Sequence, residues 1–200
     1  MKKAIILLFL FGFVQTSNAQ KPDKPQVVSV SFGASLAASV LMDTSNLWAD
    51  IPYQPKNFTR KATPAFVFTY DKRLERRWSI GGAFSYQHYN ISSEDTTGAF
   101  VAETANLNRI HISFRSLIHY GKKEKVDMYS GFKLGYFMQT VNDRTGTQYY
   151  NAMQNLAFNR VTAGLVPFGI RWFVHEDFGI NFETSLGRAT AFQLGANYRW

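Results

Sequence analysis

The sequence contains no cysteine. Disulfide bonds and thiolate metal sites are therefore excluded, and so is a lipid-modified N-terminus, which requires a cysteine directly after the cleavage site. Beyond its first segment the chain also lacks a long apolar run, and a membrane-spanning helix needs about 20 apolar residues. The chain must therefore be stabilised without disulfides, and a bundle of membrane helices is excluded.

The first residues have the layout of a secretory signal peptide. Lys2 and Lys3 form a positively charged start, residues 4–14 are apolar, and Ser17 and Ala19 are the small residues that a signal peptidase recognises. We expect residues 1–19 to be cleaved from the mature chain; the alternative is a retained anchor, for which the apolar run is too short. An exported protein follows from this pattern.

The mature chain would then comprise a short periplasmic tail, residues 20–26, and one domain, residues 27–200. Cleavage removes only two of the 22 basic residues, which still outnumber the 14 acidic ones. A basic balance can indicate nucleic-acid binding. Because an exported protein does not normally meet nucleic acid, we expect an anionic lipid surface as the partner instead.

Strict alternation of apolar and polar residues dominates the rest of the chain and predicts β-strands. We count eight alternating segments. They are Val27–Val40, Thr63–Tyr70, Trp78–Tyr89, Asn108–Tyr120, Val126–Thr140, Arg160–Phe173, Phe178–Gly187 and Ala191–Trp200. In the sixth segment Val166, Phe168 and Ile170 alternate in one phase and Val161 and Leu165 in the other, so its register is ambiguous.

The two faces of these segments differ in size as well as polarity. One face is bulky and aromatic, in a chain with 18 Phe and 10 Tyr, whereas the other is mostly Gly and Ser. The interior of a small barrel is narrow and favours small residues. The pattern therefore predicts an all-β fold, an eight-stranded antiparallel up-and-down transmembrane β-barrel with its bulky face toward lipid. A soluble, lipocalin-like barrel would invert the faces.

Short and long connections alternate along the chain, as periplasmic turns and extracellular loops do in such barrels. The short ones are Asp71–Arg77, Gly121–Lys125 and Val174–Asp177, and the long ones are Leu41–Ala62, Asn90–Leu107 and Val141–Asn159. An even number of strands then places both termini in the periplasm. We expect the protein in the outer membrane of a Gram-negative cell.

Aromatic residues gather at the strand ends nearest the short turns. An amphipathic ring is well placed at the level of the lipid headgroups, so these residues predict an aromatic girdle. The general enrichment of aromatics in strands is the alternative explanation. The girdle residues are Tyr70, Trp78, Tyr120, Trp172, Phe178 and Trp200.

The last segment carries a family resemblance. Phe192, Leu194, Tyr198 and Trp200 form an amphipathic strand that ends on an aromatic residue. This resembles the C-terminal signature of outer-membrane barrels, which implies recognition by the barrel-assembly machinery. The whole mature chain is similar to the small outer membrane protein β-barrel domain family, with the architecture of the OmpA membrane domain and of opacity and PorT-type proteins. The resemblance implies fold and location rather than activity.

Charged residues on the small-residue face predict an ionic network inside the barrel. Alternation places Glu183 inside, and apart from Asp127 near the rim it is the only acid there. We expect it to pair with at least one of Arg115, Lys133 and Arg171, because a buried charge needs a partner. The predicted lumen network is Glu183, Arg115, Lys133, Arg171 and Arg199. Such a network would fill and seal the lumen; a narrow conducting pore is the alternative.

No motif indicates catalysis, a cofactor or a metal. His111 and Ser113 share one face of a strand, which raises the alternative of a lipid-modifying enzyme, but no Ser-His-acid motif accompanies them. The other histidines are scattered. We therefore expect a non-enzymatic barrel with a structural or surface-interacting role, its aromatic long loops available to an extracellular or envelope protein partner. A narrow channel and an accessory subunit of an envelope complex are the alternatives.

Overall fold

The computed structural model describes residues 24–34, 58–94, 101–120, 125–143, 158–187 and 190–200, which fold as antiparallel β-strands. The expected signal peptide, residues 1–19, lies outside the described residues. Among those described, no helix is long and apolar enough to cross a membrane. The strands are β1 (Gln26–Ala34), β2 (Phe58–Ala62), β3 (Ala65–Glu75), β4 (Trp78–Glu94), β5 (Val101–His119), β6 (Val126–Asp143), β7 (Phe158–Phe173), β8 (Phe178–Leu186) and β9 (Phe192–Arg199).

Eight of these strands close into a barrel, which confirms the predicted fold. The hydrogen-bonded order β4-β3-β1-β9-β8-β7-β6-β5 returns to its start through a pairing of β4 with β5. Every pairing is antiparallel. β1, the first strand of the chain, pairs with β9, the last strand. The ninth strand, β2, pairs with the far half of β4 beyond the end of β3, within a segment that the sequence pattern assigned to a link.

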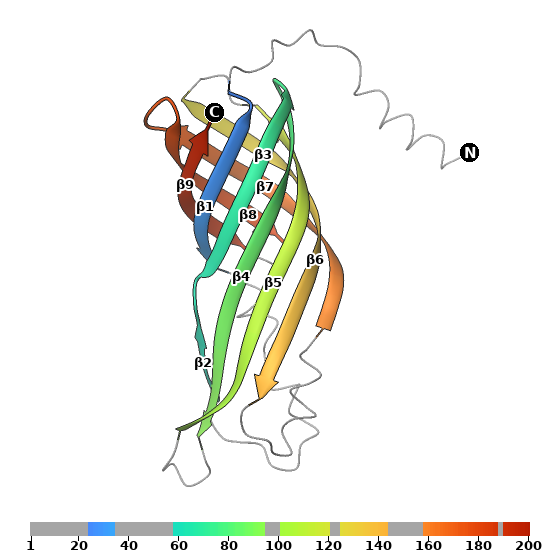
Figure 1. Cartoon of the computed structure of the whole chain (residues 1–200), viewed down its shortest axis with the longest axis vertical. Helices are drawn as coiled ribbons and strands as arrows, with labels where there is room; N and C mark the ends of the chain where they lie inside the picture. The colour runs from blue at the N-terminus through green and yellow to red at the C-terminus, as the bar shows by residue number, and fades with distance from the viewer. Residues whose placement is uncertain (1–23, 35–57, 95–100, 121–124, 144–157, 188–189) are drawn as a thin grey trace, which may run out of the picture.

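The barrel is much taller on one side than on the other. β4, β5 and β6 contain 17, 19 and 18 residues, whereas β1, β8 and β9 contain 9, 9 and 8. Figure 1 shows the three long strands reaching far below the short ones. The predicted link Asn90–Leu107 is therefore largely strand. Polar and apolar residues do not alternate in this segment, so the sequence pattern does not predict a strand there. The strands are nevertheless paired by backbone hydrogen bonds, which do not depend on side-chain polarity.

The short turns and the chain's C-terminus lie together at the other end of the barrel (Figure 1). The first of these turns is tighter than predicted, because β3 continues through Asp71 to Glu75 and leaves only Arg76 and Arg77 in the turn. The hydrogen bond from the His119 backbone N–H to the Arg77 carbonyl then ties the turn to β5.

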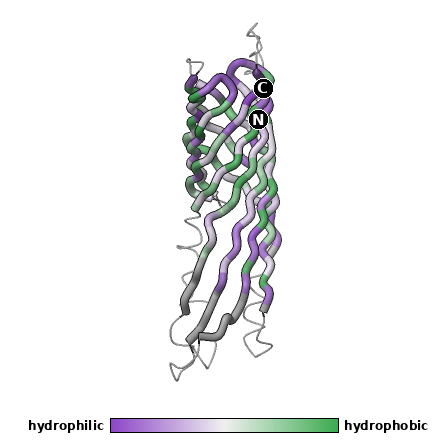
Figure 2. Tube along the Cα trace, turned by 60° about the vertical axis from the view of Figure 1, so that its left-hand side comes forward, coloured by the Kyte–Doolittle hydropathy of each residue, from purple (hydrophilic) through white to green (hydrophobic). Residues whose placement is uncertain are grey.

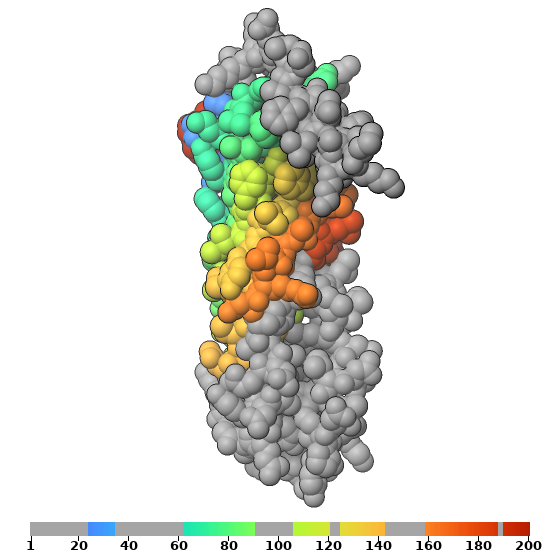
Figure 3. Space-filling model, turned by 90° about the vertical axis from the view of Figure 1, so that its right-hand side faces the viewer, coloured from blue at the N-terminus to red at the C-terminus, as the bar shows by residue number. Residues whose placement is uncertain are grey.

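Apolar and polar residues alternate along much of the barrel wall (Figure 2), and the apolar ones are exposed while the polar ones are buried. In β8, Phe178, Ile180 and Phe182 are exposed while Asn181 and Glu183 are buried. Figure 3 shows part of the outer surface, over β5, β6 and β7. The bulky face is therefore outside, as expected for a barrel in lipid and opposite to a lipocalin-like protein.

The ambiguous sixth segment contains a β-bulge. The β7–β8 register shifts between Leu165 and Phe168, so one phase of the alternation holds before the bulge and the other after it. Val161, Leu165 and Phe168 consequently all point outward, while Val166 at the bulge is buried. The expectation that Val166 shares the outer face with Phe168 is wrong for this reason.

Candidate functional site: the charged lumen

Glu183 lies at the centre of the barrel, fully buried. Its Oε2 accepts a hydrogen bond from Arg115 Nη2 at 2.6 Å and another from the Tyr129 hydroxyl at 2.9 Å. Its Oε1 accepts one from Lys133 Nζ at 2.6 Å. These partners come from β6 and β5, which are two and three strands away from β8 in the hydrogen-bonded order, so the carboxylate links non-adjacent strands through the lumen.

Asp71 is a second buried acid that the sequence pattern missed. Its carboxylate pairs with Arg115, whose Nε lies 3.0 Å from Oδ1, and with Arg171 Nη2 through Oδ2. The run of charged residues that follows Asp71 predicts a turn beginning there. Asp71 nonetheless keeps the phase of the buried Val67 and Thr69 on β3, which is the signal that would have identified it.

Asp127 is the third buried acid of the lumen and lies nearer the short turns. Its Oδ1 accepts hydrogen bonds from Arg73 Nη2 and contacts His119 Nδ1, both at 2.7 Å, and its Oδ2 lies 3.5 Å from Arg171 Nη1. Arg171 therefore links Asp127 to Asp71 and does not pair with Glu183. Three carboxylates and four basic side chains, those of Arg73, Arg115, Lys133 and Arg171, form one continuous network across the described lumen.

Tyr129 packs at the centre of this network although it belongs to a residue type expected outside. Its ring lies under the Arg171 guanidinium at 4.6 Å and near that of Arg115 at 5.8 Å. A buried cation can be stabilised by an aromatic face as well as by a carboxylate. The ring, with Leu117 and Val166, also supplies an apolar contact inside the lumen.

Arg199 does not belong with Glu183, which corrects the predicted network. In the β8–β9 register Glu183 lies opposite Gln193, and Arg199 is six residues further along β9, roughly 20 Å away at the usual strand rise. Its Nε instead donates to the Glu176 carbonyl at 2.6 Å, and its guanidinium covers the Phe173 ring at 3.8 Å. It therefore closes the end of the barrel near the β7–β8 turn.

Ser79, His119 and Asp127 are connected in the order of a Ser-His-Asp catalytic triad. Ser79 Oγ lies 2.7 Å from His119 Nε2, and His119 Nδ1 lies 2.7 Å from Asp127. However, Ser79 is 1% exposed, and Arg73 Nη2 is 2.7 Å from the same His119 nitrogen. A nucleophile must reach its substrate. This buried arrangement is better explained as part of the ionic network than as a catalytic site.

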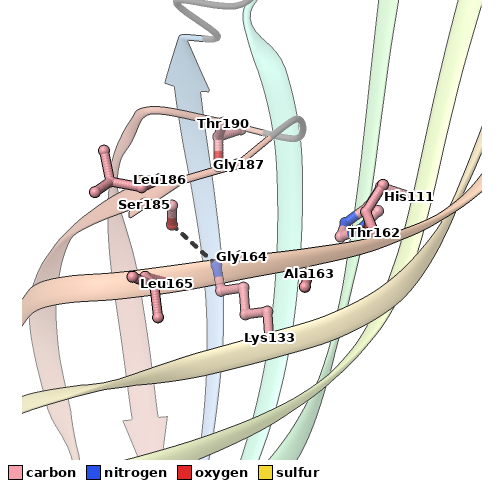
Figure 4. A pocket seen from close by; sticks show the side chains of 10 residues that line it. All are labelled: His111, Lys133, Thr162, Ala163, Gly164, Leu165, Ser185, Leu186, Gly187 and Thr190. Atoms are coloured by element: carbon pink, nitrogen blue, oxygen red, sulfur yellow. Dashed lines mark hydrogen bonds between the residues drawn. The ribbon is translucent and has the colours of Figure 1, made fainter.

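The pair considered for catalysis, His111 and Ser113, does not form a hydrogen-bonded couple. His111 Nε2 contacts Thr162 Oγ1 at 2.9 Å, while the Ser113 hydroxyl has no hydrogen-bond partner among the described residues. Beside His111 a small pocket of about 20 Å³ borders Lys133 and Ser185, which are hydrogen bonded at 3.1 Å (Figure 4). That volume holds about one water molecule. Among the described residues, no group of three or more His, Asp or Glu is arranged to hold a metal ion.

The residues predicted for the girdle lie on the outer face, at the end that carries the short turns. All six are exposed or half-exposed. Rings from β3, β8, β9 and the end of the chain after β9 contact one another, with Tyr70 and Trp200 at 6.4 Å, Tyr198 and Trp200 at 5.7 Å, and Phe178 and Tyr198 at 4.8 Å between centroids. The residues of the predicted assembly signal, Phe192, Leu194, Tyr198 and Trp200, also point outward.

Known proteins resemble this chain in structure but not detectably in sequence. No protein-family model matches it, and no curated protein does. The outer membrane protein OprG of Pseudomonas aeruginosa superposes with a TM-score of 0.55 at 7% identity, over 88% of this chain and 96% of OprG. The N-terminal β-barrel domain of OprF from the same organism gives 0.50 at 12% identity, over 88% and 98%. The chain has the fold of the small outer-membrane barrels.

Other small outer-membrane barrels match more weakly. Ail of Yersinia pestis, crystallised with the heparin analogue sucrose octasulfate, gives a TM-score of 0.49 at 12% identity, over 90% of this chain and 100% of Ail. At such identities the likeness concerns the fold alone. The function of this chain must therefore be argued from its own residues.

Proposed function

We propose that this chain is a non-enzymatic integral protein of the outer membrane, a barrel with a structural or surface-interacting role whose lumen is sealed by the charged network. The observation that carries the proposal is the combination of an apolar outer face with Glu183, Asp71, Arg115 and Arg171 fully buried inside. In water the outer face would be an extended exposed apolar surface, which soluble proteins avoid.

The network itself supports sealing rather than conduction. Side chains from β3, β5, β6, β7 and β8 meet in the lumen within hydrogen-bond distance of one another. An ion would have to displace these paired charges to pass, and a buried charge without its partner is strongly disfavoured. A narrow channel is the second candidate, and nothing among the described contacts favours it over the sealed barrel.

The proposed orientation places the short turns and both termini in the periplasm and the tall wall of β4, β5 and β6 outside the cell. Its partners are then outer-membrane lipids along the outer face, the barrel-assembly machinery during insertion, and an extracellular or envelope protein at the long connections. The aromatic ends of the strands beside the short turns would lie at the inner headgroup level. An accessory position in an envelope complex is compatible with the same surfaces.

Surface labelling of intact cells tests both location and orientation. An epitope in the β4–β5 connection, residues 95–100, should be accessible to antibody, whereas one beside Glu75 in the β3–β4 turn should be accessible only after the outer membrane is permeabilised. Fractionation should place the protein in the outer membrane, with a folded band that shifts on heating. Labelling of the Glu75 site alone on intact cells would reverse the orientation, and recovery in the soluble fraction would refute the membrane location.

A further inference from the structure

The β3–β4 hairpin presents basic side chains on the outside of the barrel, at the end with the short turns. Lys72, Arg76 and Arg77 are all exposed. Arg73, between them, instead turns inward and pairs with Asp127. Within the described part of the chain, no carboxylate forms an ion pair with the three exposed residues. Together with the exposed Glu75, these side chains leave the outside of the hairpin with a net charge of +2.

The opposite side of the same rim is neutralised. Glu176 and Asp177 in the β7–β8 turn are approached by Lys24 from the N-terminal segment, which donates to Asp177 and lies 3.9 Å from the Glu176 carboxylate. The β3–β4 turn of this rim is therefore net positive, whereas the acids of the β7–β8 turn have a basic partner. A negatively charged ligand would be attracted to the β3–β4 side, where the exposed basic residues outnumber the single exposed acid, Glu75.

Apolar and aromatic side chains lie beside the exposed basic residues of the hairpin. Lys72 lies opposite Ile80 in the β3–β4 register, and it has the outward phase of Phe68 and Tyr70. Leu74 and Trp78 are also exposed, and Trp78 is held in place by a hydrogen bond from its indole Nε1 to Ser116 Oγ at 2.8 Å. Cations above an apolar wall suit an amphiphile with an anionic head and acyl chains.

We propose that the outer side of the β3–β4 hairpin is a binding site for an anionic glycerophospholipid. The phosphate and any further headgroup charge lie against Lys72, Arg76 and Arg77, and an acyl chain runs along Ile80 and Trp78. A membrane lipid fits better than an acidic protein or a nucleic acid, because the charges are continuous with the apolar outer face. The proposal rests on the membrane location proposed above, but not on which end faces the periplasm.

Lipid retention by the purified barrel tests this site. The full chain is inserted into nanodiscs of phosphatidylglycerol and phosphatidylethanolamine in equal amounts, released with mild detergent, and its retained lipids are measured by native mass spectrometry. We expect enrichment of phosphatidylglycerol in the wild type. The double variant Lys72→Gln/Arg76→Gln should lose this preference by about fivefold for each charge removed, and high salt should weaken it in the wild type.

The matched control is Lys125→Gln/Arg160→Gln, which removes two exposed charges outside the hairpin: Lys125 directly before β6, at another turn of the same rim, and Arg160 near the start of β7. It should retain the wild-type preference, with all proteins first shown to be folded by their heat-modifiable bands. Equal retention of both lipids by the wild type, or an equal loss in the two double variants, would overturn the site. Failure of the wild type to enter nanodiscs at all would instead refute the membrane location.

Discussion

At the scale of single residues, the buried carboxylates are what make the charged lumen stable. Glu183 contacts two cations and Asp71 contacts two, with Arg115 shared between them. A cation buried without such a partner is strongly destabilised. Each acid therefore has a much larger effect on stability than a carboxylate on the surface.

Replacing Glu183 with Gln should destabilise the barrel by about 3–5 kcal/mol, because Arg115 and Lys133 would lose their shared anion in a poorly hydrated space. Urea unfolding of the purified protein in lipid vesicles measures this change. Glu176→Gln is the control, since that side chain is 84% exposed and should alter stability by less than about 1 kcal/mol. Equal midpoints for the two variants would refute the ionic network.

The contact between Lys24 and Asp177 predicts a pH effect outside the strands. The hydrogen bond from Lys24 lowers the pKa of Asp177 below its ordinary value. A lowered folded-state pKa means that the contact stabilises the protein above the unfolded pKa and is lost as the pH falls through the folded one. In an NMR titration, Lys24→Gln should raise the Asp177 pKa toward its ordinary value. An unchanged pKa would show that the contact does not form in solution.

Alternation alone was sufficient to place Glu183, because Phe182 and Thr184 beside it keep the outward phase. It failed for Asp71, where a dense run of charges resembled a turn although the strand continued. It also failed for Arg199, whose phase is inward but whose position at the strand end takes it away from Glu183. Phase along a strand can be predicted from sequence, whereas depth in the lumen depends on the stagger between strands.

At the scale of elements, β7 shows how a bulge reconciles two conflicting patterns. Residues before Leu165 and after Phe168 follow opposite phases, and the register shift brings both apolar sets to the outer face. From the sequence the two phases were visible, and Pro167 removed a ladder donor, but the position of the extra residue was not determined. The tall ends of β4 and β5 were missed for a different reason, since their polar residues carry no alternating signal.

Deleting Pro167 should therefore prevent normal folding. Loss of one residue at the bulge would force either Val161, Ala163 and Leu165 or the following apolar set to face the charged interior. Pro167→Ala preserves the number of residues and should fold with little loss. The measurement is the yield of heat-modifiable protein after refolding into detergent micelles. Equal yields for the deletion and the substitution would show that the bulge does not set the phase of β7.

At the scale of the whole molecule, the apolar outer face, the closed barrel and the charged lumen together support the proposed sealed membrane barrel. The eight-stranded closed architecture could be predicted because each strand has an apolar face and the connections alternate in length. The added strand β2 and the unequal wall heights could not, since they depend on which backbone edges remain free to pair. Neither feature changes the charged network between β3, β5, β6, β7 and β8.

Single-channel recording in planar lipid bilayers tests the sealed lumen most directly. Protein whose insertion has been verified by its heat-modifiable band should give no steady conductance steps in 1 M salt at moderate voltage, because Glu183, Asp71 and their cations occupy the pathway. Arg115→Ala/Glu183→Ala, if it remains folded, should produce openings by removing the central pair. Regular ohmic steps from the wild type, unchanged in the double variant, would contradict the sealed barrel and establish a channel.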